Sequence, residues 1–430
     1  MRDLINIKLR KMSYTIAEKI LIQHSNLNKI APEQFVDCDI DLIMVHEQLG
    51  GRIHEEYEKL GINRVWDSNK IFFILDHWVP APTISAAQMH QDCRKFAKKY
   101  NFVHNMGMDK GICHQVLPEM GFAKPGMLIV GSDSHTTTYG AFNCLSTGIG
   151  ATDVSVVFAT GKLWFKVPES FKIKLSGKLN KGVMSKDFIL TLIGNISTKG
   201  AIYKSLEFHG EGAESISVDG RMTISNMAVE AGAKFGVFLP DNKLKSWLKN
   251  KNINSYNFVY PDADATYEKT LEYNLSEITP VVAKPSNPEN LARIEEVLGT
   301  EIDEAFLGSC TNGRMEDMRI AAKILKGKKI HSNVRLIVIP ASKEIYKLSL
   351  KEGLIEIFIK AGAVVGNPTC GPCIGGHLGV LGPEEVCISS TNRNFVGRLG
   401  AQSSKVYLAS PATVAASALD GKIKDPREVL

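Results

Sequence analysis

A cysteine pair in a loop of glycine and proline constrains this chain more than any other feature. Cys370 and Cys373 lie in the segment NPTCGPC, residues 367–373, and glycines follow at positions 375 and 376. Glycine allows the backbone to come close to a bulky group. The loop is therefore suited to hold an inorganic centre through its two thiolates.

A third cysteine lies in a similar setting. Cys310 stands about sixty residues upstream in the segment GSCTNGR, residues 308–314. Thiolates hold iron–sulfur clusters, and an electron-transfer cluster normally uses four of them. Three cysteines instead indicate a [4Fe–4S] cluster whose fourth iron is open to substrate or water and acts as a Lewis acid.

Two other interpretations of the cysteines stay open on spacing alone. Structural zinc usually needs a second paired motif, and none lies near Cys310. A thioredoxin-like redox pair would open a helix directly after its first cysteine, whereas glycine and proline surround Cys370. Zinc is the stronger alternative, and spacing alone favours it as much as the cluster.

Composition predicts a soluble protein of about two to three domains. The 430 residues are 44% hydrophobic and 23% charged, as in ordinary globular proteins. The net charge of +5 is spread out, with no basic stripe among aromatics, which argues against nucleic acid as a partner. No apolar run could span a membrane, and the N-terminus lacks the apolar core of a secretory signal. Eight scattered cysteines favour a reducing, cytoplasmic location.

Short apolar runs alternate with helical patterns along the N-terminal part. Residues 71–75 and 127–130 read as buried strands, and residues 86–100 between them read as a helix. Strands and helices in alternation predict an α/β fold with mostly parallel sheets. In such folds, ligands gather at the carboxyl ends of the strands.

We expect three α/β domains, at residues 1–167, 168–283 and 284–430. The first junction is predicted at residues 166–169, and a proline-rich stretch, residues 279–288, reads as a second linker. The third domain has expected strands at residues 304–307, 334–339 and 385–389, and a last helix between Ser410 as N-cap and Gly421.

Polar residues follow two of the predicted strands directly. Asp76 and His77 come after the strand at 71–75, and Ser132-Asp133-Ser134-His135 comes after the strand at 127–130. A histidine beside a carboxylate can act as a proton donor. By itself, an aspartate turn cap next to a buried structural histidine is the commoner arrangement. Neighbouring residues of a strand also point in opposite directions, so a Ser/His/Asp triad is not expected here.

Three other segments carry candidate polar residues. His114 lies in the segment GICHQ, where a buried structural histidine is the alternative interpretation. Asn226 and Glu230 are four residues apart and would share one face of a helix. The loop after the strand at 385–389 contains Asn392, Arg393 and Arg398. Arginine recognises carboxylates through two parallel hydrogen bonds, which suits a dicarboxylic acid, although a basic surface loop is the alternative.

Taken together and in this order, these motifs resemble the aconitase superfamily over nearly the whole chain. The resemblance is greatest to the large subunits of the two-chain isopropylmalate isomerases and homoaconitases. It implies three aconitase-like α/β domains around a [4Fe–4S] cluster bound by Cys310, Cys370 and Cys373. The segment at residues 46–52 matches a region where family members often carry a polar site residue, but its register is uncertain and no role is assigned there.

The resemblance also implies roles for the other candidates. Asp76 and His77 would assist the loss of the substrate hydroxyl, and His114, Asp133, His135 and Glu230 would form the hydrogen-bond network around it. Ser134, Arg393 and Arg398 would contact or support substrate carboxylates. Asn226 and Asn392 would lie on the cluster side of the substrate site.

By the same resemblance, we expect a hydro-lyase that isomerises a hydroxy acid by dehydration and rehydration. The first expectation is 2-isopropylmalate to 3-isopropylmalate, in leucine biosynthesis, and homoaconitate or citramalate-type substrates are the alternatives. Single-chain members continue into a fourth domain with the catalytic base, so a separate small subunit is expected to supply that swivelling domain. A zinc-binding structural or interaction protein is the alternative from another class.

Overall fold

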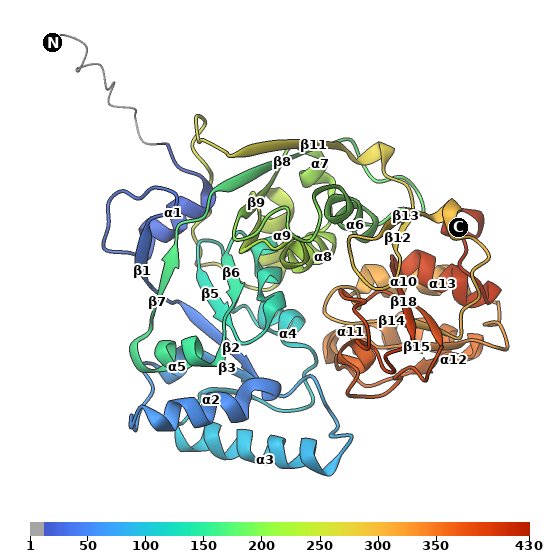
Figure 1. Ribbon diagram of the computed structural model, residues 1–430, viewed down its shortest axis with the longest axis horizontal. Coiled ribbons are helices and arrows are strands. Elements are labelled where there is room, and N and C mark those ends of the chain that lie inside the picture. The colour runs from blue at the N-terminus through green and yellow to red at the C-terminus, as the bar shows by residue number, and fades with distance from the viewer. Residues whose placement is uncertain (1–12) are drawn as a thin grey trace, which may run out of the picture.

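The computed structural model describes residues 13–430 and has the predicted α/β architecture (Figure 1). Within that range the strands form three larger sheets, two of them wholly parallel, and one two-stranded ribbon. The ribbon pairs β1 (Phe35–Asp39) with β7 (Lys162–Lys166) in antiparallel fashion. No helix of residues 13–430 combines the length and apolarity that crossing a bilayer requires.

The first sheet has five parallel strands. Their order is β4 (His104–Met106), β3 (Ile71–Ile74), β2 (Leu42–His46), β5 (Leu128–Gly131) and β6 (Leu145–Gly148). The expected strands at residues 71–75 and 127–130 are confirmed as β3 and β5, and the expected helix is α3 (Ile84–Lys99). Both β3 and β5 are buried along their whole length, which explains their unbroken apolar sequences.

Helices cover both faces of the first sheet. On one face lie α2 (Glu47–Lys59), α3 and α5 (Ala151–Thr160), whose apolar side chains share one core with the strands. The other face packs against α4 (Cys113–Glu119) and a long 3-10 helix, η2 (Ser134–Phe142). Figure 1 shows α2, α3 and α5 together at the lower edge of the molecule.

The second sheet has four parallel strands. Their order is β10 (Phe235–Phe238), β9 (Ser205–His209), β8 (Ser170–Ser176) and β11 (Lys269–Asn274). Its core includes apolar residues of α6 (Ser185–Ile196) and α8 (Val218–Met227). The sequence of β8 alternates apolar and polar residues, and its apolar residues are buried.

The third sheet has seven strands and is mixed. Their order is β13 (Leu291–Arg293), β12 (Val281–Ala283), β18 (Lys405–Ala409), β17 (Val386–Ser389), β14 (Glu304–Leu307), β15 (Arg335–Val338) and β16 (Val364–Val365). The strands expected at residues 304–307, 334–339 and 385–389 are confirmed. The expected second linker is wrong in part, because its residues 281–283 form β12, which pairs with β13 and β18.

The three-domain division stays a prediction, with the second sheet beginning at Ser170 and the third at Val281. The last helix, α13 (Pro411–Asp420), has the expected ends: the Ser410 hydroxyl accepts from Thr413 N, and Gly421 closes the helix at φ 77°. The other α-helices are α1 (Ile16–Gln23), α7 (Glu211–Ser215), α9 (Asn242–Asn250), α10 (Met315–Leu325), α11 (Lys343–Lys351) and α12 (Leu354–Ala361).

Candidate active site

The loop after β3 holds a buried carboxylate–histidine pair. His77 Nδ1 donates to Asp76 Oδ1 at 2.6 Å, and Asp76 Oδ2 accepts from Cys113 N at 2.7 Å. Burial alone would lower the pKa of His77, but the Asp76 charge outweighs it and raises that pKa well above its usual value. The ring therefore holds a proton on Nδ1 and presents Nε2 toward Asp133, whose Oδ2 is 3.6 Å away.

Asp133 is the centre of a histidine network. It follows β5 as the N-cap of η2 and accepts from His135 N at 2.7 Å. Its Oδ1 also accepts from His114 Nε2 at 2.9 Å, and His135 Nδ1 lies 3.3 Å away. Burial would raise the pKa of Asp133, but hydrogen bonds from His114, His135 and His77 hold it well below its ordinary value.

Glu230 joins this network to the second and third sheets. His135 Nε2 donates to Glu230 Oε1 at 2.8 Å, and Arg393 Nε lies 2.8 Å from the same oxygen. Burial would raise the pKa of Glu230, but the His135 and Arg393 contacts lower it. The segment with Asn226 and Glu230 begins as α8 and tightens into a 3-10 turn (Ala228–Ala231), so the expected single helix changes type between them.

The three cysteines predicted as ligands lie beside the same network, where Asp133 acts on Cys310 and His77 on Cys370. Cys310 follows β14, Cys370 is the N-cap of the 3-10 helix η6 (Gly371–Ile374), and Cys373 lies within that helix. The exposed fractions of the three cysteines are 6%, 5% and 4%. Amide groups of Asn226 and Asn392 donate to Cys310 Sγ at 3.2 and 3.3 Å. The Asn392 Oδ1 atom also accepts from Cys373 Sγ at 3.5 Å, so one amide lies between two of the sulfurs.

The spacing of these thiols distinguishes two kinds of metal centre. A tetrahedral zinc ion, with Zn–S bonds of about 2.3 Å, would hold its sulfurs about 3.8 Å apart. Within residues 13–430, the one group of three or more potential ligand atoms all within 4.8 Å of one another is His46, Glu47, Asp76 and His77. In this structure the three sulfurs therefore do not all lie within 4.8 Å of one another, a wider spacing than one zinc ion holds, whereas a polynuclear cluster bridges a wider set of thiolates.

Burial favours the protonated thiol form of Cys310 and Cys370. It raises the pKa of Cys370 to about 12 and that of Cys310 well above its usual value, and the other thiols add to the effect on Cys310. Binding of a cationic centre would release these protons. The buried donor set of three thiols and two asparagine amides fits an iron–sulfur cluster.

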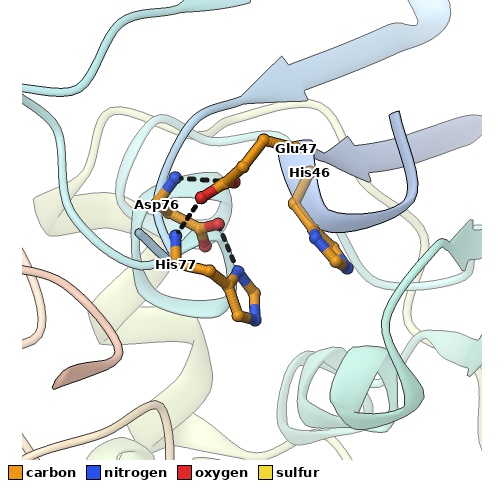
Figure 2. A group of neighbouring side chains, drawn as sticks. All are labelled: His46, Glu47, Asp76 and His77. Carbon is orange, nitrogen blue, oxygen red and sulfur yellow. Dashed lines mark hydrogen bonds and ion pairs between the residues drawn. The ribbon is translucent and has the colours of Figure 1, made fainter. Parts of the chain in front are cut away.

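His46 and Glu47, which received no role from the sequence, are part of the site. His46 is the last residue of β2, the neighbour of β3 and β5 in the first sheet, and Glu47 is the first residue of α2. The His46 ring stacks on His77 with centroids 4.3 Å apart (Figure 2). Its Nδ1 accepts from Gln48 N, so Nε2 carries the proton, 3.2 Å from Ser132 O. Burial and then the His77 charge lower the pKa of His46 to about 4.

The close grouping of His46, Glu47, Asp76 and His77 is a hydrogen-bond network rather than a metal site. Figure 2 shows Glu47 directed at the backbone of the Asp76–His77 loop. Glu47 accepts from the N–H groups of Asp76, His77 and Trp78, and Asp76 accepts from His77 and from Cys113 N. The carboxylate oxygens that a cation would need are already used.

Arg314, at the end of the GSCTNGR segment, is a third residue to which the sequence assigned no role. It is fully buried and donates to the carbonyl oxygens of Cys310 and Thr311 at 2.6 and 2.5 Å. Its Nε donates to Gln115 Oε1 at 2.9 Å, which joins the Cys310 loop to α4 beside His114. Arginine is the cation suited to several simultaneous contacts of this kind.

Two predicted site residues are less closely tied to the others. Ser134 is half-buried, and its hydroxyl lies 3.4 Å from His135 Nδ1. Arg398 is half-buried beside the cysteine loop, where its carbonyl oxygen lies 3.1 Å from the place a Cβ at Gly375 would take. Its Nε atom is buried and has no hydrogen-bond partner within the described chain.

Comparison with known proteins agrees with this arrangement. The model of the aconitase family (aconitate hydratase) matches residues 18–421. The chain belongs to the aconitase family. A solved structure, that of aconitase X from Thermococcus kodakaraensis, has a similar fold, with a TM-score of 0.50. The two sequences are 12% identical, and the match covers 88% of this chain and 89% of that chain.

Relatives in the aconitase family are similar over almost their full length. The 3-isopropylmalate dehydratase large subunit of Halothermothrix orenii is 49% identical over 422 residues, 97% of this chain and all of the relative. The corresponding large subunit 1 of Methanopyrus kandleri is 48% identical over 419 residues, with the same coverage. A probable methanogen homoaconitase large subunit from Methanothermobacter thermautotrophicus is 47% identical over 422 residues, 97% of this chain and 98% of the relative.

Proposed function

We propose that this chain is the cluster-binding large subunit of a two-chain 3-isopropylmalate dehydratase, a hydro-lyase of leucine biosynthesis. It would convert 2-isopropylmalate into 3-isopropylmalate by dehydration and rehydration. The observation that carries the proposal is the meeting of the Asp76–His77–Asp133 network with three buried cysteines. The names of relatives that are 47–49% identical over nearly the whole chain support the same function.

Cys310, Cys370 and Cys373 would hold a [4Fe–4S] cluster, one per chain. When bound, a cluster with three cysteine ligands supplies an open, Lewis-acidic iron without net redox chemistry. The amide groups of Asn226 and Asn392 point at Cys310 Sγ and would stabilise its thiolate through N–H···S hydrogen bonds.

His77 would donate a proton to the departing hydroxyl from Nε2. Asp76 fixes the ring from the other side through the 2.6 Å bond to Nδ1, so Nε2 is the nitrogen free to act. Asp133 orients the neighbouring histidines, His114 and His135, by accepting from both. A positioned proton donor of this kind contributes roughly 10²–10⁴-fold to a rate.

The opposite side of the site would bind the substrate. Glu230, held by His135 and Arg393, would accept a hydrogen bond from the substrate hydroxyl. Arg393 and Arg398 would bind substrate carboxylates, and the buried, unpartnered Nε of Arg398 is an available donor for such a contact. Ser134, half-buried beside His135, would add a hydroxyl donor to a carboxylate.

A separate small subunit would complete the enzyme. The relatives are named as large subunits, and we propose that the partner carries the swivelling domain with the base that removes the carbon-bound proton. Eight unpaired cysteines suit work in the reducing cytoplasm. A homoaconitase large subunit is the second candidate, because a relative of that name is 47% identical over 97% of this chain.

The test is anaerobic purification of the chain with candidate small subunits. We expect bound iron and inorganic sulfide, and interconversion of 2- and 3-isopropylmalate. Assays with homoaconitate and citramalate in parallel would separate the second candidate from the first. Zinc without sulfide, or no turnover of any hydroxy acid with any small subunit, would refute the proposal.

A further inference from the structure

Both the N–H groups and the carbonyl groups of the Asp76–His77 backbone form hydrogen bonds with side chains from other segments. One carboxylate group accepts hydrogen bonds from three successive N–H groups, beginning at Asp76. Glu47 Oε2 accepts from Asp76 N at 3.0 Å and Oε1 accepts from His77 N at 2.7 Å (Figure 2). Oε1 also accepts from Trp78 N at 2.8 Å. Glu47 is the first residue of α2, so a helix on one side of the sheet fixes this loop.

The carbonyl oxygens of Asp76 and His77 both lie within hydrogen-bond distance of one hydroxyl group, that of Thr369. Thr369 Oγ1 lies 2.9 Å from Asp76 O and 3.0 Å from His77 O, and it is fully buried. Its neighbour Cys370 donates its N–H to Asp76 O at 3.3 Å. The loop that carries the proton donor is therefore bound directly to the loop that carries two of the three cysteines.

Burial raises the pKa of Glu47 to about 6, and the hydrogen bonds from the loop oppose that rise. A carboxylate in the interior is costly unless hydrogen bonds satisfy it, and backbone N–H groups do so here. The nearest side-chain base, His90, keeps its Nε2 3.9 Å from Glu47 Oε1 and has no hydrogen-bond partner for that atom within the described chain. The principal partners of Glu47 are therefore the three N–H groups of the loop.

We infer that Glu47 and Thr369 are positioning residues that together fix His77 relative to Cys370. This inference rests on the proposed function, in which His77 is the proton donor and Cys370 a cluster ligand. Neither residue would touch the substrate. Loss of either contact would allow the loop to shift, and a displacement of about 1 Å at a reacting group can cost roughly 10²-fold in rate.

The first experiment uses the complete enzyme, reconstituted with its small subunit. Thr369→Val removes only the hydroxyl and keeps the shape, Thr369→Ser restores it, and Glu47→Gln removes one of the acceptor oxygens. We expect kcat to fall about 10–100-fold in the valine and glutamine variants, KM to change less than about threefold, and serine to recover most of the rate. Glu55→Gln, on the exposed side of α2, is the matched control and should leave kcat unchanged.

Iron and sulfide content must be measured in the same samples. Unchanged content together with reduced kcat supports positioning of the proton donor. The inference is overturned if Thr369→Val and Glu47→Gln keep the wild-type kcat. It is equally overturned if serine at position 369 fails to recover activity.

The second experiment uses the full chain without cluster or small subunit. The short His77 Nδ1–H···Asp76 bond should give a far-downfield proton signal in a histidine-labelled NMR spectrum, assigned by its loss in Asp76→Asn. We expect this signal to shift or disappear in Thr369→Val and Glu47→Gln and to persist in Thr369→Ser and Glu55→Gln. Unchanged signals in both altered variants would contradict the inference. Because this readout needs neither iron nor turnover, it stays valid if the proposed function fails.

Discussion

The carboxyl edges of the first and third sheets contribute to one site, but with opposite electrostatics. At the first edge, the pKa values of Asp76 and Asp133 are lowered and that of His77 is raised, so these three groups are ionised. The third edge presents thiols that contact neutral amides, as Cys310 does with Asn226 and Asn392. His77 and Cys310 are both buried, so burial alone does not explain the difference.

The difference follows from what each edge would hold. A proton donor needs fixed charges nearby that keep its proton in place, and paired carboxylates and imidazoles provide them. A cluster with thiolate ligands is itself anionic, and the amide N–H groups at Cys310 would stabilise it. On the proposed function, the first sheet would supply the proton donor and the third sheet the cluster ligands of a single site.

The largest effect should come from the third edge. Cys310→Ser or Cys373→Ser should abolish cluster binding and lower activity by at least about 10³-fold, because a Lewis-acidic metal contributes several kcal/mol to the reaction. Iron and sulfide analysis after anaerobic purification measures the loss. Cys387→Ala, a buried cysteine within β17, is the control and should keep its cluster. A cluster that survives either serine substitution would remove that cysteine from the ligand set.

A substitution of His77, at the carboxyl edge of the first sheet, should lower the rate of proton transfer without affecting cluster binding. His77→Gln should lower kcat by about 10²–10⁴-fold, the usual contribution of a positioned general acid. Its iron and sulfide content should remain that of the wild type, because His77 is not among the ligands. Steady-state kinetics and metal analysis on one preparation make this test. Loss of the cluster in this variant would mean that the two edges are not functionally distinct.

A substitution of Arg314 would test how much the connection between the Cys310 loop and α4 contributes to stability. Arg314→Lys keeps the charge but cannot reach Cys310 O, Thr311 O and Gln115 together, so some of these buried groups lose their partner. We expect the free energy of unfolding to fall by about 2–4 kcal/mol, measured by urea denaturation of the cluster-free chain. Arg319→Lys changes an exposed ion pair with Glu352 and should cost less than about 1 kcal/mol. Equal losses in the two variants would show that burial of Arg314 adds nothing.

The smallest effect should come from a carboxylate–histidine pair outside the site. His24 Nε2 lies 2.6 Å from Asp41 Oδ2, and Asp41 is one-third exposed. Burial would lower the pKa of His24, but the Asp41 bond outweighs it and raises the value; for Asp41 the His24 bond likewise outweighs burial and lowers the pKa. The pair therefore stabilises the fold most between about pH 4 and 6.5.

This stabilisation should disappear as pH rises through the raised pKa of His24 or falls through the lowered pKa of Asp41. The melting temperature of His24→Gln should lie furthest below that of the wild type near pH 5–6, by an amount equivalent to about 0.5–1 kcal/mol. At pH 9 the two proteins should melt closer together. A difference that does not change with pH would show that the pair acts by packing rather than by charge.

Local sequence signals predicted the parts of the fold and site that depend on local structure. The strands before Asp76 and before Ser132 were predictable because buried parallel strands have unbroken apolar sequences. Polar residues directly after those strands then pointed to the sheet edge. The ends of α13 were predictable because Ser410 and Gly421 satisfy the helix ends through side chain and backbone alone.

Contacts between distant segments left no such signal. Thr369 meets Asp76 and His77 across more than 290 residues, and a threonine before a cysteine has no characteristic pattern. His46 and Glu47 lie at the end of a strand, but placing them requires the neighbours of β2 in the sheet, which sequence alone does not give. The three-residue strand β12 lies among prolines, and three residues are too few to show an alternating pattern.

The position of β18 has a consequence for how this protein is made. This strand, Lys405–Ala409, is inserted between β12 and β17 in the interior of the third sheet, although it is synthesised after all three cysteines of the site. A growing chain on the ribosome therefore lacks a finished third sheet around these cysteines until residues 405–409 have been made. On the proposed function, insertion of the cluster would follow synthesis of this strand rather than precede it.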